Sequence, residues 1–353
     1  MDDSRMEIVA CPNEMNKQLR ALCTSKISHW KNLNPEEKFY SEPLSGGITN
    51  SLYRCWTEDG CSVVVRVFGK NTDSVISREA EGEATRLLAK NGFGKKVLAE
   101  FHNGRIEEWI SGRSISLEEM RNRTISASIA SRLATLHNQV IHSKIFTAKR
   151  SSLWETIEDW ANKAAAVRFD CGSSQQFQLS LLEIPKRIKQ LALTRIFLPL
   201  RYPSPVVFSH NDLLSGNIII DKSEGAKHYI QFIDFEYASY NHRAFDIANH
   251  FCEICGFECD WTQFPSLEFQ LAFARAYLTT LNAREPLDQE VQALIREVLP
   301  WVLTCHLFWG FWSCIQAYTS TIDFNYLEYA QKRFEGFDYH SRTLQIDMSS
   351  SKK

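Results

Sequence analysis

The chain has 353 residues and a formal net charge of −2, with 40 basic and 42 acidic side chains. This length suffices for one large core or two lobes. A hydrophobic content of 44% with 23% charged residues is ordinary for a globular protein. A nucleic-acid-binding protein normally carries a basic excess, so we expect no nucleic-acid partner. The charge balance is compatible with a small cationic substrate.

The N-terminal residues and the cysteines bear on the cellular compartment. Residues 1–4 are polar and no apolar run follows them, so we predict no signal peptide. The ten cysteines stand at irregular spacings, which indicates reduced thiols in a cytoplasmic protein. Cys252, Cys255 and Cys259 form one closer run. We interpret them as core thiols, because no fourth ligand stands at a spacing typical of a zinc site.

The first third of the chain carries mainly strand patterns. Residues 1–40 are mixed and polar, and we expect a helix there that leads into the fold. Residues 44–69 are rich in β-branched and aromatic side chains and predict two or three strands. Residues 78–90 have apolar side chains at helical spacing, which predicts a helix. Residues 96–110 predict a hairpin that turns at Asn103-Gly104.

After Ser111-Gly112 the pattern becomes mainly helical. We therefore predict an α+β fold with two lobes. Residues 1–110 would form a β-rich N-lobe, and residues 111–353 would form a mainly helical C-lobe. Three short apolar strands interrupt the helices, at residues 206–208, 218–220 and 230–233.

The segment from Val298 to Ile322 contains no Asp, Glu, Lys or Arg and is long enough to span a bilayer. Its tryptophans Trp301, Trp309 and Trp312 are spread through the segment, whereas transmembrane helices concentrate Trp near their ends. We therefore predict a buried helix that lines a site, and no stable membrane insertion.

The most specific pattern surrounds Asp212. His210-Asn211-Asp212 is followed by Asn217, five positions after the aspartate, and then by Asp234-Phe235-Glu236. Protein kinases use the same spacing in His-Arg-Asp-x-x-x-x-Asn and Asp-Phe-Gly. The apolar strands on both sides favour a catalytic interpretation over a plain turn followed by a strand cap.

Phosphoryl transfer needs a carboxylate that positions the nucleophilic hydroxyl, metal ions that neutralise the phosphates, and donors that hold them. Asp212 is the candidate for the hydroxyl. Asn217 and Asp234 are the candidates for Mg²⁺, a hard cation that prefers oxygen ligands. The sequence thus predicts a phosphotransferase that uses ATP and Mg²⁺.

A turn of small residues precedes the strand that carries Arg66. Its backbone N–H groups and hydroxyls suit phosphates, and the candidates are Ser45, Gly46, Gly47, Thr49 and Asn50. Arg66 stands mid-strand, where protein kinases place a phosphate-binding Lys, and Glu81 is its expected partner. The alternatives are a plain hairpin turn and a salt bridge that only holds the lobe together.

Aromatic residues and one carboxylate in the second half of the chain suggest an acceptor site. Aromatic faces with a carboxylate suit an ammonium ligand. The residues are Glu253, Tyr237, Tyr240, Trp309, Trp312, Tyr326 and Tyr329. Aromatic residues at helical spacing are more often plain core, and the pattern alone favours that alternative.

Taken together, these segments resemble the choline/ethanolamine kinase family over about residues 40 to 340. The resemblance rests on four segments in the same order, at residues 208–217, 233–241, 244–251 and 308–313. It implies a two-lobed, protein-kinase-like fold with ATP in the cleft. It also implies that Asp212 is the base and that Asn217 and Asp234 bind Mg²⁺.

The resemblance assigns further roles. Arg66 and Glu81 would form the ion pair on the phosphate side, and Asp246 would brace the catalytic loop. Glu107, Glu108 and Ile110 would form the hinge that faces adenine. The amino-alcohol pocket would consist of Tyr237, Glu253, Trp309, Trp312 and Tyr329.

The implied reaction is the ATP-dependent phosphorylation of ethanolamine to phosphoethanolamine, the first step of the CDP-ethanolamine route to phosphatidylethanolamine. Leu214 favours ethanolamine, because choline kinases tend to carry Gln at that position. Ser45-Gly46-Gly47 and residues 104–107 are similar to choline kinases, so a choline or dual-specificity kinase is the alternative. An aminoglycoside-type kinase of another small molecule and an inactive binding module are more distant alternatives. A homodimer is compatible with this interpretation.

Overall fold

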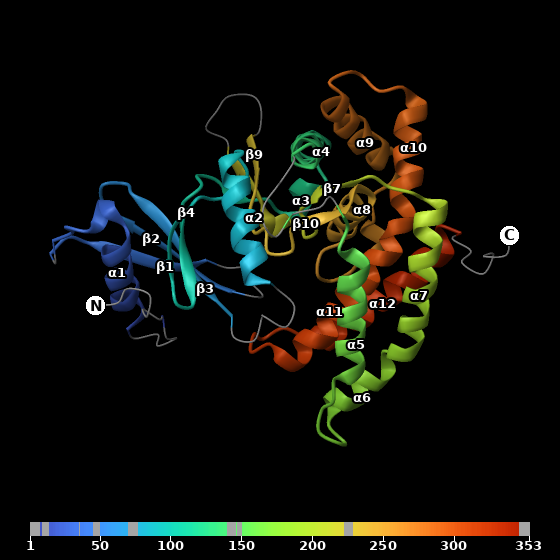
Figure 1. Cartoon of the computed structure of the whole chain (residues 1–353), viewed down its shortest axis with the longest axis horizontal. Helices are drawn as coiled ribbons and strands as arrows, with labels where there is room; N and C mark the ends of the chain where they lie inside the picture. Colours follow the sequence, from blue (N-terminus) through green and yellow to red (C-terminus); the bar gives the residue numbers. More distant parts are fainter. Residues whose placement is uncertain are drawn as a thin grey trace. The chain divides into compact units, whose positions relative to one another are not determined.

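The computed structural model describes residues 8, 14–34, 36–44, 50–69, 77–139, 146, 150–221 and 229–345. The chain divides into two compact units (Figure 1). The first comprises Met1–Ser74, Thr85–Ser111 and Ser320–Phe324, and the second comprises Val75–Ala84, Gly112–Thr319 and Asn325–Lys353. A β-sheet dominates the first unit and helices dominate the second, which confirms the predicted α+β class. The lobe boundary at residue 110 stays a prediction.

The first unit is built on one antiparallel sheet. Its strands are β1 (Phe39–Leu44), β2 (Asn50–Thr57), β3 (Ser62–Phe68), β4 (Val97–Phe101) and β5 (Gly104–Glu108), in the order β1-β2-β3-β5-β4. The hairpin over residues 96–110 is confirmed. The first strand begins at Phe39, inside the segment that we expected to be helical. The reason is burial, since Phe39 packs edge-on against Trp30 with ring centres 5.5 Å apart.

One hydrophobic core underlies this sheet. Helix α1 (Met15–Lys26) buries Leu19, Leu22 and Cys23, which recur at helical spacing on one face. They join a cluster with the buried strand residues Val63, Val65 and Ile106. Four successive residues of β3, Val63 to Arg66, are buried, and Arg66 is the charged residue among them.

A glycine controls the approach of β5 to β3. A Cβ atom on Gly104 would lie 2.1 Å from the carbonyl oxygen of Arg66, so no other residue fits there without a shift of backbone. Val67 and Gly104 face each other in the register of the two strands.

Helix α2 (Arg78–Lys90) follows β3 in the sequence, and its bounds are the predicted ones.

The second unit contains two small antiparallel sheets. The strands are β6 (Arg113–Ser114), β7 (Val206–Ser209), β8 (Ile218–Asp221), β9 (Tyr229–Phe232) and β10 (Ser239–His242), in the orders β6-β8-β9 and β10-β7. The predicted strands at 206–208, 218–220 and 230–233 are therefore confirmed to within a residue or so at each end. The segments between β7 and β8 and after β9 carry Asp212 and Asp234.

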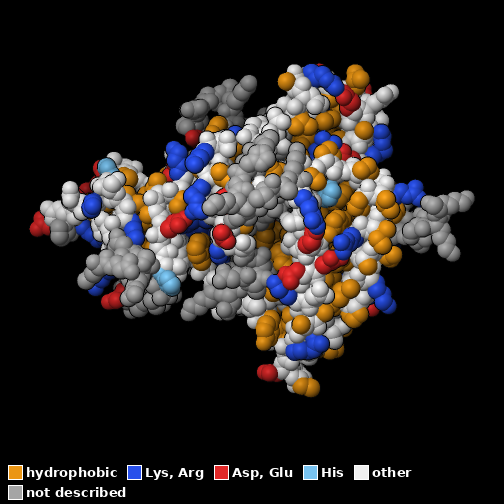
Figure 2. Space-filling model, viewed as in Figure 1, with side chains coloured by type: hydrophobic (Ala, Val, Ile, Leu, Met, Phe, Trp, Pro, Cys, Tyr) orange, Lys and Arg blue, Asp and Glu red, His pale blue; other side chains and the backbone are white. Residues whose placement is uncertain are grey.

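Helices make up the rest of the described second unit. They are α3 (Leu117–Met120), α4 (Arg123–His137), α5 (Leu153–Ala166), α6 (Ser174–Leu181), α7 (Ile184–Arg201), α8 (Arg243–Glu253), α9 (Leu267–Asn282), α10 (Asp288–Val298), α11 (Val302–Thr319) and α12 (Tyr326–Thr343). Over α7, hydrophobic side chains lie beside Lys and Arg on the visible face (Figure 2). Leu193, Ile196 and Leu200 are exposed hydrophobic residues of this helix.

The apolar segment predicted as a buried helix is buried. By length and composition, the helical stretch Asp288–Thr319 is able to cross a membrane, yet 94% of its most apolar window lies inside the protein. Gly310 lets α12 approach α11 closely, because a Cβ atom there would lie 2.4 Å from the ring of Phe334. Packing in the core of this unit therefore accounts for the apolar sequence.

Candidate active site

The loop after β7 is shaped by the buried carboxylate of Asp246. The backbone N–H groups of His210 and Asn211 donate to its two oxygens at 2.8 and 2.7 Å. Asn211 has a φ of 66°, a left-handed conformation that Asn adopts more readily than most residues. His210 Nε2 donates to the carbonyl oxygen of Ile233 at 2.9 Å. The loop is thereby tied to the residue that precedes Asp234.

Asp246 is itself held by a buried histidine. His137 Nε2 lies 2.9 Å from the Asp246 carboxylate, and His137 Nδ1 lies 2.7 Å from the Tyr277 hydroxyl. Burial raises the pKa of Asp246, but the hydrogen bonds and charges of His137 and His210 together outweigh burial and lower that pKa below its usual value. Asp246 is thus an ionised acceptor, and this geometry fits the bracing role that the resemblance implies.

Asp212 and Asn217 are joined by two hydrogen bonds. Asn217 Nδ2 donates to the backbone carbonyl of Asp212 at 2.8 Å and to its Oδ2 at 3.0 Å. The amide carbonyl of Asn217 is then the atom that could ligate a cation. Burial raises the pKa of Asp212 well above its ordinary value, and the nearby charges of Glu253, Asp234 and Glu236 raise it further. Several carboxylates thus surround the predicted base.

Three carboxylates lie close to one another beside this loop. Glu81, Asp234 and Glu236 each place one oxygen within 4.8 Å of the others. Arg78 Nη1 lies 2.7 Å from Glu81 Oε2 and 3.8 Å from Glu236 Oε2. Oxygen donors of this kind suit a hard cation such as Mg²⁺. Of the two predicted metal ligands, the structure brings Asp234 into this group.

The predicted aromatic pocket residues touch one another. Trp312 Nε1 donates to the Tyr237 hydroxyl at 2.8 Å. The ring centres of Tyr237 and Trp309 are 5.3 Å apart, and those of Trp309 and Trp312 are 5.4 Å apart. Trp309 Nε1 donates to Asn249 Oδ1 at 2.7 Å. Hydrogen bonds therefore fix the rings of α11 and Tyr237 in place.

The other two predicted pocket residues share an arginine. Arg333 Nη1 lies 3.0 Å from Glu253 Oε1 and 3.1 Å from the Tyr329 hydroxyl. Burial raises the pKa of Glu253, and the charge and hydrogen bond of Arg333 oppose that rise. The charge of Glu253 also acts on Asp212, so this predicted acceptor residue lies near the predicted base.

In the first unit, Arg66 lies in a buried cluster of charges. Arg66 Nη1 is 3.8 Å from Glu107 Oε1, Arg105 Nε is 2.6 Å from the same oxygen, and Lys95 Nζ is 3.6 Å from Glu107 Oε2. Burial would raise the pKa of Glu107, but the charges of Arg105, Lys95 and Arg66 outweigh burial and lower it to about 2. Three cations thus surround one carboxylate in this cluster.

The remaining predicted nucleotide residues are placed less completely. Asn50 is buried at the start of β2, opposite Phe68. Glu108 and Ile110 are half-buried at and beyond the end of β5. Ser45, Gly46, Gly47 and Thr49 lie outside the described residues.

The predicted pair between Arg66 and Glu81 stays a prediction. Arg66 belongs to the first unit and Glu81 to the second. Within its own unit, each has another partner, Glu107 for Arg66 and Arg78 for Glu81.

Sequence reasoning did not single out Arg78, Glu236 or Arg333. Glu236 stands two residues after Asp234, and this spacing of acidic residues is visible in the sequence. Arg333 had a signal as well, because it interrupts the apolar stripe of α12 between Tyr329 and Phe337. A cation in the middle of such a stripe needs a buried partner. Arg78 offers no comparable signal.

The cysteine run consists of core thiols, as predicted. Cys252, Cys255 and Cys259 are buried, and each is a free thiol. Among the described residues, the single group of acidic, histidine or cysteine side chains close enough to hold a metal is the carboxylate group above. Nine cysteines in the described part of the chain are free.

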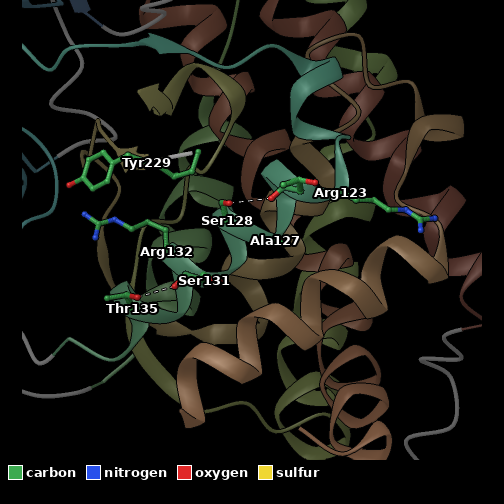
Figure 3. A pocket seen from close by; sticks show the side chains of 9 residues that line it. Arg123, Ala127, Ser128, Ser131, Arg132, Thr135 and Tyr229 are labelled. Atoms are coloured by element: carbon green, nitrogen blue, oxygen red, sulfur yellow. Dashed lines mark hydrogen bonds between the residues drawn. The ribbon is translucent and has the colours of Figure 1, made fainter. Parts of the chain in front are cut away.

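A pocket of about 770 Å³ lies away from these residues, between α4 and β9. In Figure 3 the side chains of Arg123 and Arg132, both on α4, point in opposite directions. The hydroxyls of Ser128 and Thr135 donate to backbone carbonyls of their own helix, at 3.2 and 2.9 Å. The pocket contains none of the predicted site residues.

Comparison with known proteins agrees with this geometry. Residues 41–338 match the sequence profile of a family described as choline/ethanolamine kinase. A probable ethanolamine kinase of Arabidopsis thaliana is 38% identical, over 90% of this chain and 83% of that protein. A choline/ethanolamine kinase of Homo sapiens is 32% identical, over 97% of this chain and 93% of that protein. The solved structure of a Plasmodium vivax ethanolamine kinase is 29% identical, with a TM-score of 0.82, over 94% of this chain and 89% of that chain.

Proposed function

Because the chain belongs to the choline/ethanolamine kinase family, we propose that it transfers the γ-phosphoryl group of ATP to the hydroxyl of ethanolamine. One observation carries the proposal. The buried Asp212 accepts a hydrogen bond from Asn217, and the charge of Glu253 acts on it. Arg333 contacts both Glu253 and the Tyr329 hydroxyl. A base and a cation-binding carboxylate are thus available to one small amino alcohol.

In the proposed reaction, Asp212 accepts the proton of the ethanolamine hydroxyl. The hydroxyl oxygen forms a bond to the γ-phosphorus, the bond from that phosphorus to the bridging oxygen breaks, and ADP leaves. The raised pKa of Asp212 favours proton acceptance. The ammonium group of the bound substrate brings positive charge among these carboxylates. This charge favours the ionised form of Asp212 before the proton is transferred.

Mg²⁺ fits the donors beside Asp212. Asp234 and the amide carbonyl of Asn217 would hold it, and Glu236 and Glu81 supply further carboxylate oxygens in the same group. The bound cation would neutralise phosphate charge during transfer. Bound Mg²⁺ would also offset the mutual repulsion of these carboxylates, which Arg78 offsets in part.

We propose that the cation-rich cluster of the first unit serves the nucleotide. Arg66 and its neighbours carry net positive charge, as a triphosphate requires. The turn at Ser45, Gly46, Gly47, Thr49 and Asn50 would cover the phosphates. Glu107, Glu108 and Ile110 would face the adenine.

The choice between ethanolamine and choline depends on the acceptor pocket. A primary ammonium offers three hydrogen-bond donors, whereas a trimethylammonium offers none and prefers aromatic faces. The pocket has a carboxylate and a phenol in contact with Arg333, which favours ethanolamine, but it also has Trp309 and Trp312. We propose ethanolamine as the preferred substrate, with choline as an alternative or second substrate. A site for a bulky aminoglycoside would call for an open acidic surface instead of buried tryptophans.

The test is an ADP-release assay with ethanolamine, its mono- and dimethyl forms, and choline. We expect kcat/KM to be highest for ethanolamine and to fall with each added methyl group, because each removes a donor. A rise with methylation would assign the enzyme to choline. An absence of turnover with all four amines, in the presence of MgATP, would contradict the proposal.

We also propose a cytoplasmic location, in keeping with the reduced cysteines, and an enzyme that needs no nucleic acid or membrane partner. Its product would enter the CDP-ethanolamine route to phosphatidylethanolamine. A homodimer is compatible with these properties, and size-exclusion chromatography with light scattering measures it directly.

A further inference from the structure

Arg333 lies inside the second unit with 1% of its surface exposed. Its Nη1 donates to Glu253 Oε1 at 3.0 Å and to the Tyr329 hydroxyl at 3.1 Å. Its Nη2 donates to the carbonyl oxygen of Cys305 at 3.2 Å. The guanidinium carbon is 5.7 Å from the ring centres of Trp261 and Tyr329. Contacts from α8, α11 and its own helix α12 thus fix the guanidinium in one orientation.

A buried ion pair is a weak source of stability. Removing two charges from water costs several kcal/mol, and apolar residues of similar size often serve equally well. The surroundings of Arg333 are already rich in such residues, since Phe334 and Phe337 of the same helix are buried. Stability alone therefore gives no reason for a charged pair at this position.

The partner of Arg333 faces the proposed chemistry. Glu253 ends α8 and is 5% exposed, and its charge raises the pKa of the catalytic Asp212. In ethanolamine two carbons separate the hydroxyl oxygen from the ammonium nitrogen. A carboxylate that binds this nitrogen must therefore lie within one small molecule's length of Asp212. The charge of Glu253 acts on Asp212, as expected for a carboxylate near it.

A carboxylate in this position binds an ammonium well only while it is ionised. Burial works against ionisation, because it favours the neutral acid. Arg333 provides the opposing charge and a direct hydrogen bond, and so keeps Glu253 closer to its charged form. The second nitrogen of Arg333 is anchored on a backbone carbonyl, which prevents the guanidinium from following the carboxylate if it rotates.

From these contacts we infer that Arg333 is a positioning residue for the amine substrate, which holds the Glu253 carboxylate charged and aimed for the ammonium group. The inference rests on the proposed function and deepens it. Lys is not an equivalent replacement, because a single ammonium nitrogen cannot hold Glu253 and the Cys305 carbonyl in the same fork.

Several other ionisable groups face this pair. The pair acts on the pKa of each of these groups, and their charges would act on Glu253 in turn. They are Tyr329 and His340 on α12, Cys305 and His306 on α11, Cys255 and Cys259 after α8, and Asp212 in the catalytic loop. Cys252 on α8 also acts on Arg333. The pKa values of Tyr329, Cys305, Cys255 and Cys259 are raised and those of the two histidines are lowered, so these groups are neutral near pH 7. Asp212, and His340 with its pKa of about 4, are therefore the other groups in this set that change charge in acid together with Glu253.

The inference predicts that Arg333→Met changes KM for ethanolamine but not KM for ATP. We expect KM for ethanolamine to rise at least about tenfold, equivalent to about 1.4 kcal/mol, while KM for ATP stays within about twofold. KM for ethanolamine should be highest in acid and should fall as pH rises, because the uncompensated Glu253 then ionises. Arg333→Lys should recover part of the affinity, and Glu253→Gln should have a high KM with less dependence on pH.

Lys332→Met is the matched control. It removes a positive charge from the adjacent residue, whose partners, Glu328 on α12 and Glu258 after α8, are exposed. We expect both KM values to stay within about twofold of the wild-type values. The comparison separates a general loss of positive charge on α12 from the loss of this one contact.

The double variant Arg333→Met with Glu253→Gln guards against misfolding. It removes both charges together, so it should be more stable than Arg333→Met alone, and its KM for ethanolamine should equal that of Glu253→Gln. An unchanged KM for ethanolamine in folded Arg333→Met would overturn the inference while leaving the kinase activity intact. A uniform drop in kcat with unchanged KM values would also overturn it. Failure of the wild-type protein to bind any of the amines would overturn the inference and the proposed function together.

Discussion

The buried charges of the two units differ in sign. In the described part of the first unit, the buried charged side chains are Arg66, Arg105 and Glu107. In the described part of the second unit, they are Glu81, Asp212, Glu236, Asp246 and Glu253 against Arg187 and Arg333. The first set has an excess of cations and the second has an excess of carboxylates.

An unbalanced buried charge is costly, so a protein keeps one where a ligand supplies the opposite charge. The cation excess of the first unit suits the triphosphate of ATP. The carboxylate excess of the second suits a metal ion and an ammonium group. The comparison teaches that the buried charges of each unit are mainly opposite in sign to the ligand that we propose for it. The predictions below test this division of charge, beginning with the largest expected effect.

Asp212→Asn tests the buried carboxylates of the second unit. We expect kcat to fall about 10³-fold, within the range for loss of a general base. The protein should be as stable as the wild type or more so, because burial and the nearby carboxylates already disfavour the charge of Asp212. Turnover by ADP release and thermal unfolding measure the two effects. Asp170→Asn, at an exposed position, is the control. Turnover within tenfold of the wild-type rate would remove Asp212 from its proposed role.

Glu107→Gln tests the charge balance of the first unit. The folded-state pKa of Glu107 is about 2, below the ordinary value of 4.5. A depressed pKa contributes stability above pH 4.5, and this contribution disappears as pH falls towards 2. We therefore expect Glu107→Gln to lose about 3 kcal/mol at pH 7 and almost none near pH 2.

Urea unfolding of both proteins at a series of pH values measures the difference for Glu107→Gln. Glu100→Gln changes an exposed carboxylate of β4 and serves as the control. A difference that stays constant with pH would show that the effect comes from packing and not from ionisation.

Arg66→Met tests the cation side. We expect KM for ATP to rise about tenfold, about 1.4 kcal/mol, and KM for ethanolamine to change by less than about twofold. The reason is that Arg66 belongs to the cation cluster of the first unit, whereas the amino-alcohol pocket residues belong to the second unit. Steady-state kinetics with each substrate varied in turn decide the matter. Arg86→Met, an exposed arginine paired with Glu100, is the control. A selective rise in KM for ethanolamine would reverse the assignment of the two charge clusters.

Part of the site was predictable because its residues are close in sequence. Asn217 stands five positions after Asp212, and a single loop closes to form their hydrogen bonds. The flanking strands are short apolar runs, so their pattern is visible locally. The same holds for the hairpin of β4 and β5 and for the apolar α11.

Other parts of the site depend on contacts between distant segments. Arg333 meets Glu253 across 80 residues, and His137 meets Asp246 across 109. Arg78 and Glu236 are brought together from α2 and the segment after β9. Local propensity carries no information on such pairs, because their geometry depends on how the helices and sheets pack. The strand that begins at Phe39 was missed for a similar reason, since its packing against Trp30 overrides the polar local pattern.

The sequence by itself determined the kind of chemistry, since the order and spacing of Asp212, Asn217 and Asp234 belong to phosphoryl transfer. It also indicated the two classes of lobe and the buried helix with Trp309 and Trp312. The tertiary structure decided which charges meet. It placed a buried arginine on Glu253, the carboxylate that we propose for the acceptor, and it placed three cations around Glu107. The physical reason is that charge interactions act through space and are strongest where water is excluded. The local order of residues determines neither the distance between two charges nor their burial.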